Sequence, residues 1–248
     1  MIDLDGVLVH SSHPVQGAAE AFNRLRERRK TLIFSNNSTR SREDFADQLG
    51  EMGLSVKAEE IVNSAHIVSR YIEEEWGLSD VFTIGEGGLN KELEFIGHRL
   101  VPASEAEFVV AGMDRKLTYE KLNEALTALT RGAKFIATNL DGTYPTPEGA
   151  APGAGAIVGA IEGMGYPPLK TVGKPSPISV RIALEEAETK AENCLLVGDR
   201  LETDILAAER AGIDSVLVLT GVSAREEIEE RGIRPTYVVD ELEDLLRE

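Results

Sequence analysis

Short apolar runs alternate with amphipathic segments along most of the chain. The runs are too short for helices and are typical of buried parallel strands; they lie at 31–34, 81–84, 108–111, 135–137, 194–197, 215–219 and 236–239. Between them, apolar residues recur at helical spacing, as at Ala18, Phe22 and Leu25. Helices are therefore expected at 18–29, 41–52, 61–76, 89–96, 118–130, 156–164, 177–190 and 241–248. This alternation predicts an α/β protein with a largely parallel sheet.

Several local signals refine these elements. Ser41 and Asp44 have the spacing of a capping box, and Pro177 stands where a first-turn proline belongs. Thr203 is expected to cap a helix directly after the 194–197 run. The segment 138–155 is rich in proline and glycine and is long for a connection, so we expect a loop there that is either functional or disordered.

Polar side chains follow several of the apolar runs at the point where each run ends. These residues are Asp3 and Asp5, Ser35 and Asn36, Lys174, and Asp199. In open parallel sheets the ligand crevice lies at the carboxyl ends of the strands, so these side chains are expected to converge on one site.

The chemistry of the converging residues suits phosphoryl transfer. On an extended strand, Asp3 and Asp5 would point the same way, one as nucleophile and the other as general acid and base. Ser35, Asn36 and Lys174 offer donors or positive charge for phosphoryl oxygens. Asp199, Asp3 and the Asp5 carbonyl would supply the hard oxygen ligands that Mg²⁺ prefers. Each short motif alone is also explained by a polar turn or a helix cap, but their joint occurrence in this order favours a site.

The overall charge limits the partners of the chain. Its formal net charge is −17, from 43 acidic and 26 basic residues, which argues against nucleic acid or an anionic membrane surface as partner. No apolar run approaches the ~18 residues of a membrane helix, and no leader-like segment begins the sequence. We therefore expect a cytoplasmic protein. The negative net charge does not exclude a small anionic substrate, because a bound metal ion and one lysine can reverse the local field.

Four motifs resemble those of the haloacid dehalogenase-like hydrolases, and most closely the branch of NagD and the 4-nitrophenylphosphatases. They are Asp3-Leu4-Asp5-Gly6-Val7, Ser35-Asn36-Asn37-Ser38, Gly173-Lys174-Pro175 and the stretch from Gly198 to Ile205. The resemblance covers nearly the whole chain. It implies a Rossmann-like core at 1–78 and 173–248, with an inserted α/β cap at 79–172 that closes over the site and selects the substrate.

The resemblance also implies individual roles. Asp3 is then nucleophile and metal ligand, Asp5 protonates the leaving alcohol and later activates water, and Asp199 is a metal ligand. Asp204 supports the metal site or Lys174 indirectly, without binding the metal itself. Ser35, Asn36, Asn37 and Lys174 bind phosphate. Tyr144 either contacts the leaving group or is an ordinary surface tyrosine.

The implied activity is Mg²⁺-dependent hydrolysis of a small phosphorylated metabolite through an aspartyl-phosphate intermediate. The substrate types of this branch are sugar phosphate, phosphoglycolate, pyridoxal phosphate and 4-nitrophenyl phosphate. Two alternatives stay open: a phosphotransferase or phosphomutase on the same scaffold, and a catalytically silent module that binds a phospho-ligand. By analogy within the branch, a homodimer is one expected assembly.

The chain departs from the family at its start. Only Met1 and Ile2 precede Asp3, fewer residues than family members normally have. We therefore expect a stunted first strand and a native start upstream of Met1.

Overall fold

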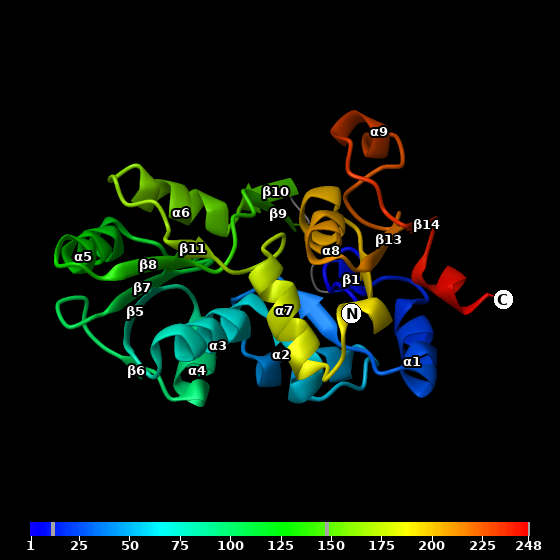
Figure 1. The fold of residues 1–248 in the computed structure, drawn as a ribbon, viewed down its shortest axis with the longest axis horizontal. Coiled ribbons are helices and arrows are strands. Elements are labelled where there is room, and N and C mark those ends of the chain that lie inside the picture. Colours follow the sequence, from blue (N-terminus) through cyan, green and yellow to red (C-terminus); the bar gives the residue numbers. More distant parts are fainter. Residues whose placement is uncertain (11–12, 147–148, 248) are drawn as a thin grey trace. The chain divides into compact units, whose positions relative to one another are not determined.

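The computed structural model describes residues 1–10, 13–146 and 149–247, in which helices and strands alternate (Figure 1). The chain divides into two compact units. Unit 1 comprises Met1–Ser35, Phe45–Val62 and Lys174–Glu248, and unit 2 comprises Asn36–Asp44 and Asn63–Gly173. The α/β class is confirmed. The boundaries expected between catalytic core and cap, at 78/79 and 172/173, stay a prediction. No helix within the described ranges is long and apolar enough to cross a membrane.

The sheet of unit 1 is assembled around the start of the chain. Parallel strands β12 (Leu195–Gly198), β13 (Asp214–Val218) and β14 (Tyr237–Val239) form one part, and β3 (Ile33–Ser35) pairs with β4 (Ile61–Asn63) in the other. Ile2 forms parallel bridges to Ile33 of β3 and to Val197 of β12. The first strand is therefore reduced to this single bridging residue, which agrees with the stunted strand expected from the sequence.

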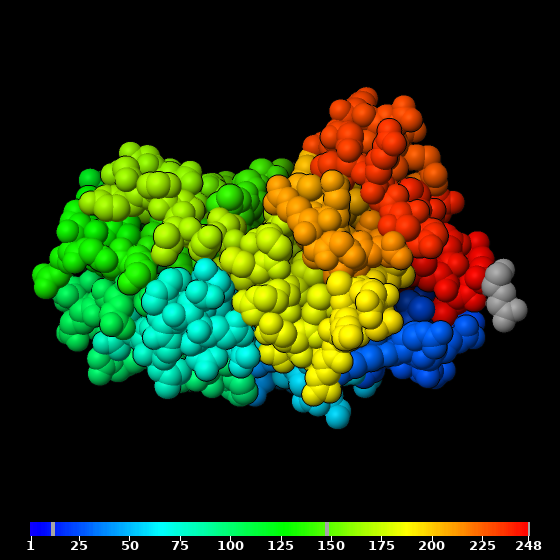
Figure 2. Space-filling view, in the orientation of Figure 1, coloured from blue at the N-terminus to red at the C-terminus, as the bar shows by residue number. Residues whose placement is uncertain are grey.

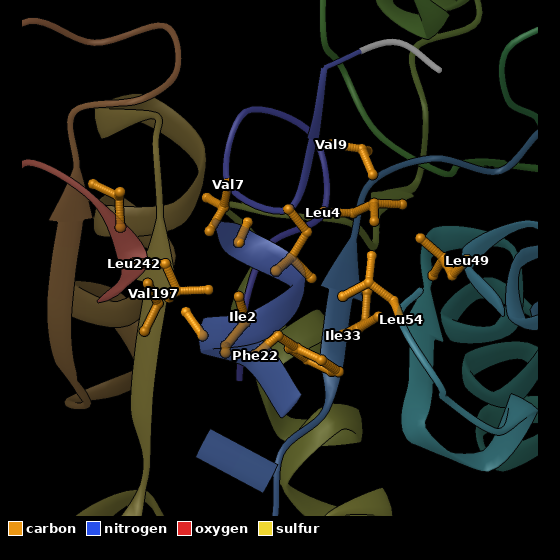
Figure 3. Packing of buried hydrophobic residues seen from close by; sticks show 14 of the residues in the cluster. Ile2, Leu4, Val7, Val9, Phe22, Ile33, Leu49, Leu54, Val197 and Leu242 are labelled. Carbon is orange, nitrogen blue, oxygen red and sulfur yellow. The ribbon is translucent and has the colours of Figure 1, made fainter. Parts of the chain in front are cut away.

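The apolar core of unit 1 surrounds that bridge. Ile2 lies between Ile33 and Val197, and Phe22 of α1 (Ala18–Arg28) packs beneath it (Figure 3). Further helices of this unit are α7 (Pro177–Glu186), α8 (Leu206–Ala211) and α9 (Glu227–Arg231). Helices α7 and α8 pack against each other on the face seen in Figure 2. In β3, β12 and β13, side chains on both faces are buried, which explains why these strands appear in the sequence as continuous apolar runs.

Unit 2 contains a parallel sheet in the order β11-β8-β7-β5-β6 (Figure 1). Its strands are β5 (Asp80–Ile84), β6 (Arg99–Leu100), β7 (Phe108–Ala111), β8 (Lys134–Ala137) and β11 (Lys170–Thr171). Its helices are α3 (Ser64–Trp76), α4 (Gly87–Ile96), α5 (Tyr119–Thr130) and α6 (Ala154–Glu162). Ile84, Val109 and Phe135 of the sheet share a buried cluster with side chains of α5 and α6.

Two local predictions about helix starts are confirmed. At the start of α2 (Arg42–Glu51), the Asp44 amide donates to Ser41 Oγ at 3.2 Å, and the Ser41 amide donates to Asp44 Oδ2 at 3.3 Å. These reciprocal bonds are a capping box. Pro177 occupies the first turn of α7, behind Ser176 as the capping residue.

Several predicted elements differ from the structure. The expected helix at 61–76 begins only at Ser64, because Ile61–Asn63 pairs as β4 with β3. The expected loop at 138–155 contains an antiparallel hairpin of β9 (Thr143–Thr146) and β10 (Gly149–Pro152), with residues 147 and 148 outside the described ranges.

Toward the carboxyl end, two further helix predictions are wrong. Thr203 caps no helix; it lies inside a π-helical turn, η3 (Leu201–Ile205), that leads into α8. The expected terminal helix is a short 3₁₀ segment, η4 (Leu242–Leu246), within the described residues. Single-turn π segments are unusual and tend to occur where side chains must be aimed at a site.

Candidate active site

Asp3 is placed by backbone pairing on both sides of the opening segment. The Ile2 amide donates to the Leu32 carbonyl at 2.8 Å, and the Asp3 amide donates to the Val197 carbonyl at 2.8 Å. Asp3 therefore lies in line with the carboxyl ends of β3 and β12, where Ser35 and Asp199 occur. Its side chain is buried. The rule about the carboxyl ends of parallel strands thus holds for this part of the predicted site.

Lys174 contacts Asp3 although the two residues are 171 positions apart in the sequence. Its ammonium donates to Asp3 Oδ1 at 2.5 Å, to Asp204 Oδ1 at 2.7 Å and to the Phe34 carbonyl at 2.8 Å. The side chain is 2% exposed. Burial acts to lower the pKa of Lys174, but the Asp204 and Asp3 carboxylates outweigh that effect and raise it. The lysine is therefore a fixed positive charge at this point of the fold.

Asp199 and Asp204 complete a group of buried carboxylates. Asp199 follows β12 directly, and its Oδ2 accepts a hydrogen bond from the Val222 amide at 2.7 Å. Asp204 lies on η3, where its Oδ2 accepts from the Arg200 amide at 3.2 Å. Both Asp204 oxygens thus accept hydrogen bonds, and the supporting role expected of this residue stays a prediction. Gly198 allows this approach, because a Cβ there would lie closer than 3.0 Å to Asp204.

The pKa values in this group are shifted by crowding. Burial raises the pKa of Asp3 well above its usual value, and Asp204, Asp199 and Asp5 raise it further against the opposing effect of Lys174. Burial and the neighbouring Asp204 raise the pKa of Asp199 to about 7. Both shifts arise because several carboxylates share a dry region with one lysine. The group therefore carries surplus negative charge when it is ionised.

A divalent cation fits this surplus. Oxygens of Asp3, Asp199 and Asp204 lie within 4.8 Å of one another, and all three residues are buried. Hard carboxylate oxygens at such spacing suit Mg²⁺ or Ca²⁺. The donor set differs slightly from the expected one, which took the Asp5 carbonyl in place of an Asp204 oxygen. Asp204, whose oxygens already accept hydrogen bonds, is better placed to hold Lys174.

Asp5 and Ser35 lie in the same unit. Asp5 is partly exposed and follows Asp3 by two residues, close enough that its charge raises the Asp3 pKa. The chain then turns at Gly6, whose φ of +88° is one that residues with side chains rarely adopt. Ser35 is the buried last residue of β3. Asp3, Lys174, Asp199 and Asp204 are thus brought together by direct contacts or close oxygens, with Asp5 beside them.

The other predicted residues belong to unit 2. The side-chain amide of Asn36 donates to Asp141 Oδ2 at 3.0 Å, and the side-chain amide of Asn139 donates to the same oxygen at 2.8 Å. The Asn37 side-chain oxygen accepts from the Thr39 amide at 3.0 Å and from its hydroxyl at 2.7 Å. Tyr144 is partly exposed on the β9–β10 hairpin. The phosphate and substrate contacts expected of these three residues stay predictions.

The sequence interpretation missed a loop of unit 1 at Thr220–Ser223. The Thr220 hydroxyl donates to the Gly6 carbonyl at 2.7 Å, and the Ser223 amide donates to the Asp199 carbonyl at 3.1 Å. A signal was available, since small and polar residues follow the apolar run at 215–219 just as they follow the other strands. The rule that found Asp199 applies equally to this strand end.

Family models and relatives agree with this geometry. A model described as haloacid dehalogenase-like hydrolase matches residues 1–99, and a second one for HAD-like hydrolases matches residues 171–245. An acid sugar phosphatase of Staphylococcus saprophyticus is 36% identical over 250 residues, covering 100% of this chain and 96% of the relative.

Solved structures give the same result. A p-nitrophenyl phosphatase from Archaeoglobus fulgidus has a TM-score of 0.94 and 40% identity, covering 99% of this chain and 97% of that one. A glycerol phosphate phosphatase from Mycobacterium tuberculosis, in complex with calcium, has a TM-score of 0.91 and 33% identity over 99% of this chain and 73% of that one. The chain therefore belongs to the haloacid dehalogenase-like hydrolases, in the branch of NagD and the 4-nitrophenylphosphatases, and is a phosphatase.

Proposed function

We propose that this phosphatase is Mg²⁺-dependent and hydrolyses a small phosphomonoester metabolite through an aspartyl-phosphate on Asp3. The observation that carries the proposal is the buried Lys174 ammonium, 2.5 Å from Asp3 Oδ1 inside a group of carboxylates with surplus charge. Such an arrangement suits a nucleophile beside a cation and a site for phosphoryl oxygens. The name of the staphylococcal relative favours sugar phosphates among the substrate types of the branch.

The chain's own residues account for both halves of the reaction. The Asp3 carboxylate attacks phosphorus, and the leaving alkoxide takes a proton from Asp5. Asp5 then removes a proton from water, which attacks the aspartyl-phosphate and returns Asp3 and inorganic phosphate. Lys174 and Ser35 bind the phosphoryl oxygens throughout, and Lys174 also fixes the Asp3 side chain. Asp3, Asp199 and the Asp5 carbonyl would hold the divalent cation, which would supply positive charge to offset the crowded anions.

Residues 1–78 and 173–248 form the catalytic core in this proposal, and residues 79–172 form the cap that selects the substrate. Asn36 and Asn37 contribute amide donors for phosphate. Tyr144 contacts the leaving group. On its hairpin, Tyr144 interacts with Arg115 of unit 2, which also forms a two-pronged ion pair with Glu86.

The test is phosphate release from 4-nitrophenyl phosphate and from a panel of sugar phosphates, with Mg²⁺ and with a chelator. Asp3→Asn should lose activity on the order of 10⁴-fold or more while keeping its fold by circular dichroism. Asp114→Asn is the matched control, because Asp114 is an equally buried aspartate of unit 2 that pairs with Lys121. It should retain activity.

Three outcomes would contradict the proposal. Ordinary turnover by Asp3→Asn would contradict the covalent mechanism. Phosphate release by the wild type without metal would contradict the requirement for a divalent cation. If most turnovers transferred the phosphoryl group to an added acceptor alcohol rather than to water, the result would instead favour a phosphotransferase.

A further inference from the structure

The loop Thr220–Ser223, which follows β13, contacts Asp199 through its backbone. The Val222 amide donates to Asp199 Oδ2 at 2.7 Å, and the Ser223 amide donates to the Asp199 carbonyl at 3.1 Å. The Ser223 hydroxyl in turn accepts from the Leu201 amide at 3.1 Å. Two successive amides of this loop therefore fix both the main chain and the carboxylate of one residue.

Gly221 at the centre of the loop leaves no room between it and that carboxylate. A Cβ at Gly221 would lie closer than 3.0 Å to the Asp199 side chain, and so would a Cβ at Gly6. The Asp199 carboxylate thus fits between two stretches of bare backbone. The Thr220 hydroxyl joins those stretches by donating to the Gly6 carbonyl at 2.7 Å.

We infer that Gly221 and Thr220 are positioning residues, which hold the Asp199 carboxylate in the place where it binds the divalent cation. This inference rests on the proposed metal-dependent function and adds the loop to its machinery. Core packing does not explain the fit, because Val222 is 54% exposed and the close approach at Gly221 is to the Asp199 side chain. A metal ligand must keep its oxygen within a few tenths of an ångström, so neighbours that fix its rotamer affect metal affinity directly.

The first experiment compares two glycine-to-alanine variants. Gly221→Ala adds a methyl group against the Asp199 carboxylate. Gly50→Ala adds the same group on α2, where, apart from the neighbouring helix backbone, no heavy atom of the described residues lies within 4 Å. Binding of Mg²⁺ alone is measured by isothermal titration calorimetry on the full chain. Gly221→Ala should bind Mg²⁺ at least about tenfold more weakly, in the range known for lost ligand support. Gly50→Ala should bind like the wild type.

A second pair of variants guards against a folding defect in Gly221→Ala. Thr220→Val keeps the shape of the side chain but removes its hydroxyl, and Thr220→Ser keeps the hydroxyl. Thr220→Val should raise the Mg²⁺ concentration for half-maximal activity several-fold and leave the KM for 4-nitrophenyl phosphate nearly unchanged. Thr220→Ser should restore the wild-type metal requirement. If Thr220 had only a structural role, Thr220→Val would not change the Mg²⁺ requirement selectively while leaving the KM nearly unchanged.

The outcomes separate this inference from the function on which it rests. If the wild type binds Mg²⁺ and both Gly221→Ala and Thr220→Val bind it equally well, the loop does not position Asp199 and the inference is overturned alone. If the wild type binds no Mg²⁺, the proposed function fails and takes the inference with it. Weaker binding in both variants, with Gly50→Ala and Thr220→Ser unchanged, supports the inference.

Discussion

Each unit of the molecule buries a cluster of ionisable side chains, and the two clusters are balanced in opposite ways. In unit 1, Asp3, Asp199 and Asp204 share Lys174, and the pKa values of Asp3 and Asp199 are raised. In unit 2, Glu92 has Arg42 as its partner, with Nε donating to Oε2 at 3.0 Å and the backbone amide to Oε1 at 2.6 Å. His66 Nδ1 lies 3.4 Å from the same Oε2.

The pKa of Glu92 shows the effect of that balance. Burial acts to raise it, but the His66 ring and the Arg42 amide and guanidinium outweigh burial and lower it. Equal burial therefore has different consequences. A carboxylate matched by donors and a cation contributes to the architecture, whereas carboxylates in excess of their cations form a region that gains from a further positive charge. The following predictions test this difference, from the largest expected effect to the smallest.

Removing Lys174 should have the largest effect. Lys174→Met leaves Asp3 and Asp204 buried without their cation, which should lower the free energy of unfolding by about 3–5 kcal/mol. Urea unfolding monitored by circular dichroism measures the loss. The matched control is Lys91→Met, which removes an exposed lysine paired with Asp44 and should cost less than about 1 kcal/mol. Equal losses in the two variants would mean that the unit 1 cluster is not sensitive to charge.

Adding Mg²⁺ should distinguish the clusters directly. A ligand at about 100 times its Kd stabilises the folded state by about 2.7 kcal/mol, so the Tm of the wild type should rise with Mg²⁺ and fall again with a chelator. Asp199→Asn should abolish the rise, and Glu92→Gln should keep it. A loss of the Mg²⁺ response in Glu92→Gln, rather than in Asp199→Asn, would reverse the assignment of the two clusters.

The pH dependence of stability should reveal the balanced cluster. Because the pKa of Glu92 is lowered in the folded state, its ionised form stabilises the protein above the ordinary value of 4.5, and that stability is lost as the pH falls through the folded-state pKa. Glu92→Gln should be about 1–3 kcal/mol less stable than wild type at pH 7, with the difference shrinking below pH 4.5. Glu94→Gln, an exposed change on the same helix, should show no such trend. A gap between Glu92→Gln and wild type that is constant with pH would contradict the ionised pair.

The smallest expected effect is a gain. With a chelator present, Asp199→Asn removes one of the repelling carboxylates and keeps an oxygen to accept from the Val222 amide. It should raise the free energy of unfolding by about 1 kcal/mol, a stabilisation that accompanies lost function. Urea unfolding at pH 8 measures it. A clear loss of stability would show that the ionised Asp199 is already fully compensated by its neighbours.

The contrast also explains what the sequence could predict. Asp3, Lys174 and Asp199 each follow an apolar run, and the geometry of parallel strands turns that local signal into a shared location. Glu92 carries no such signal, because a glutamate on an amphipathic helix resembles any solvent-facing residue until its partner Arg42 is known. Its burial depends on a contact between residues 50 positions apart.

Tertiary pairing also explains the wrong elements. Ile61 continues the apolar spacing of α3, so the pattern assigned it to the helix, but pairing with β3 makes it a strand residue. The β9–β10 hairpin is hidden by proline and glycine, which are uncommon in strands. The position of the Thr220–Ser223 loop directly after a strand could have indicated that it lies near the site. Its contact with Asp199 required coordinates.

The order in which the two units are completed along the chain has a consequence for synthesis on the ribosome. Every segment of unit 2 precedes Lys174, so this unit can fold as soon as Gly173 has left the exit tunnel. Unit 1 must wait for β12, β13 and the lysine that neutralises Asp3. Until then Asp3 lacks its lysine partner, and the candidate active site is assembled only after unit 2 has been translated in full.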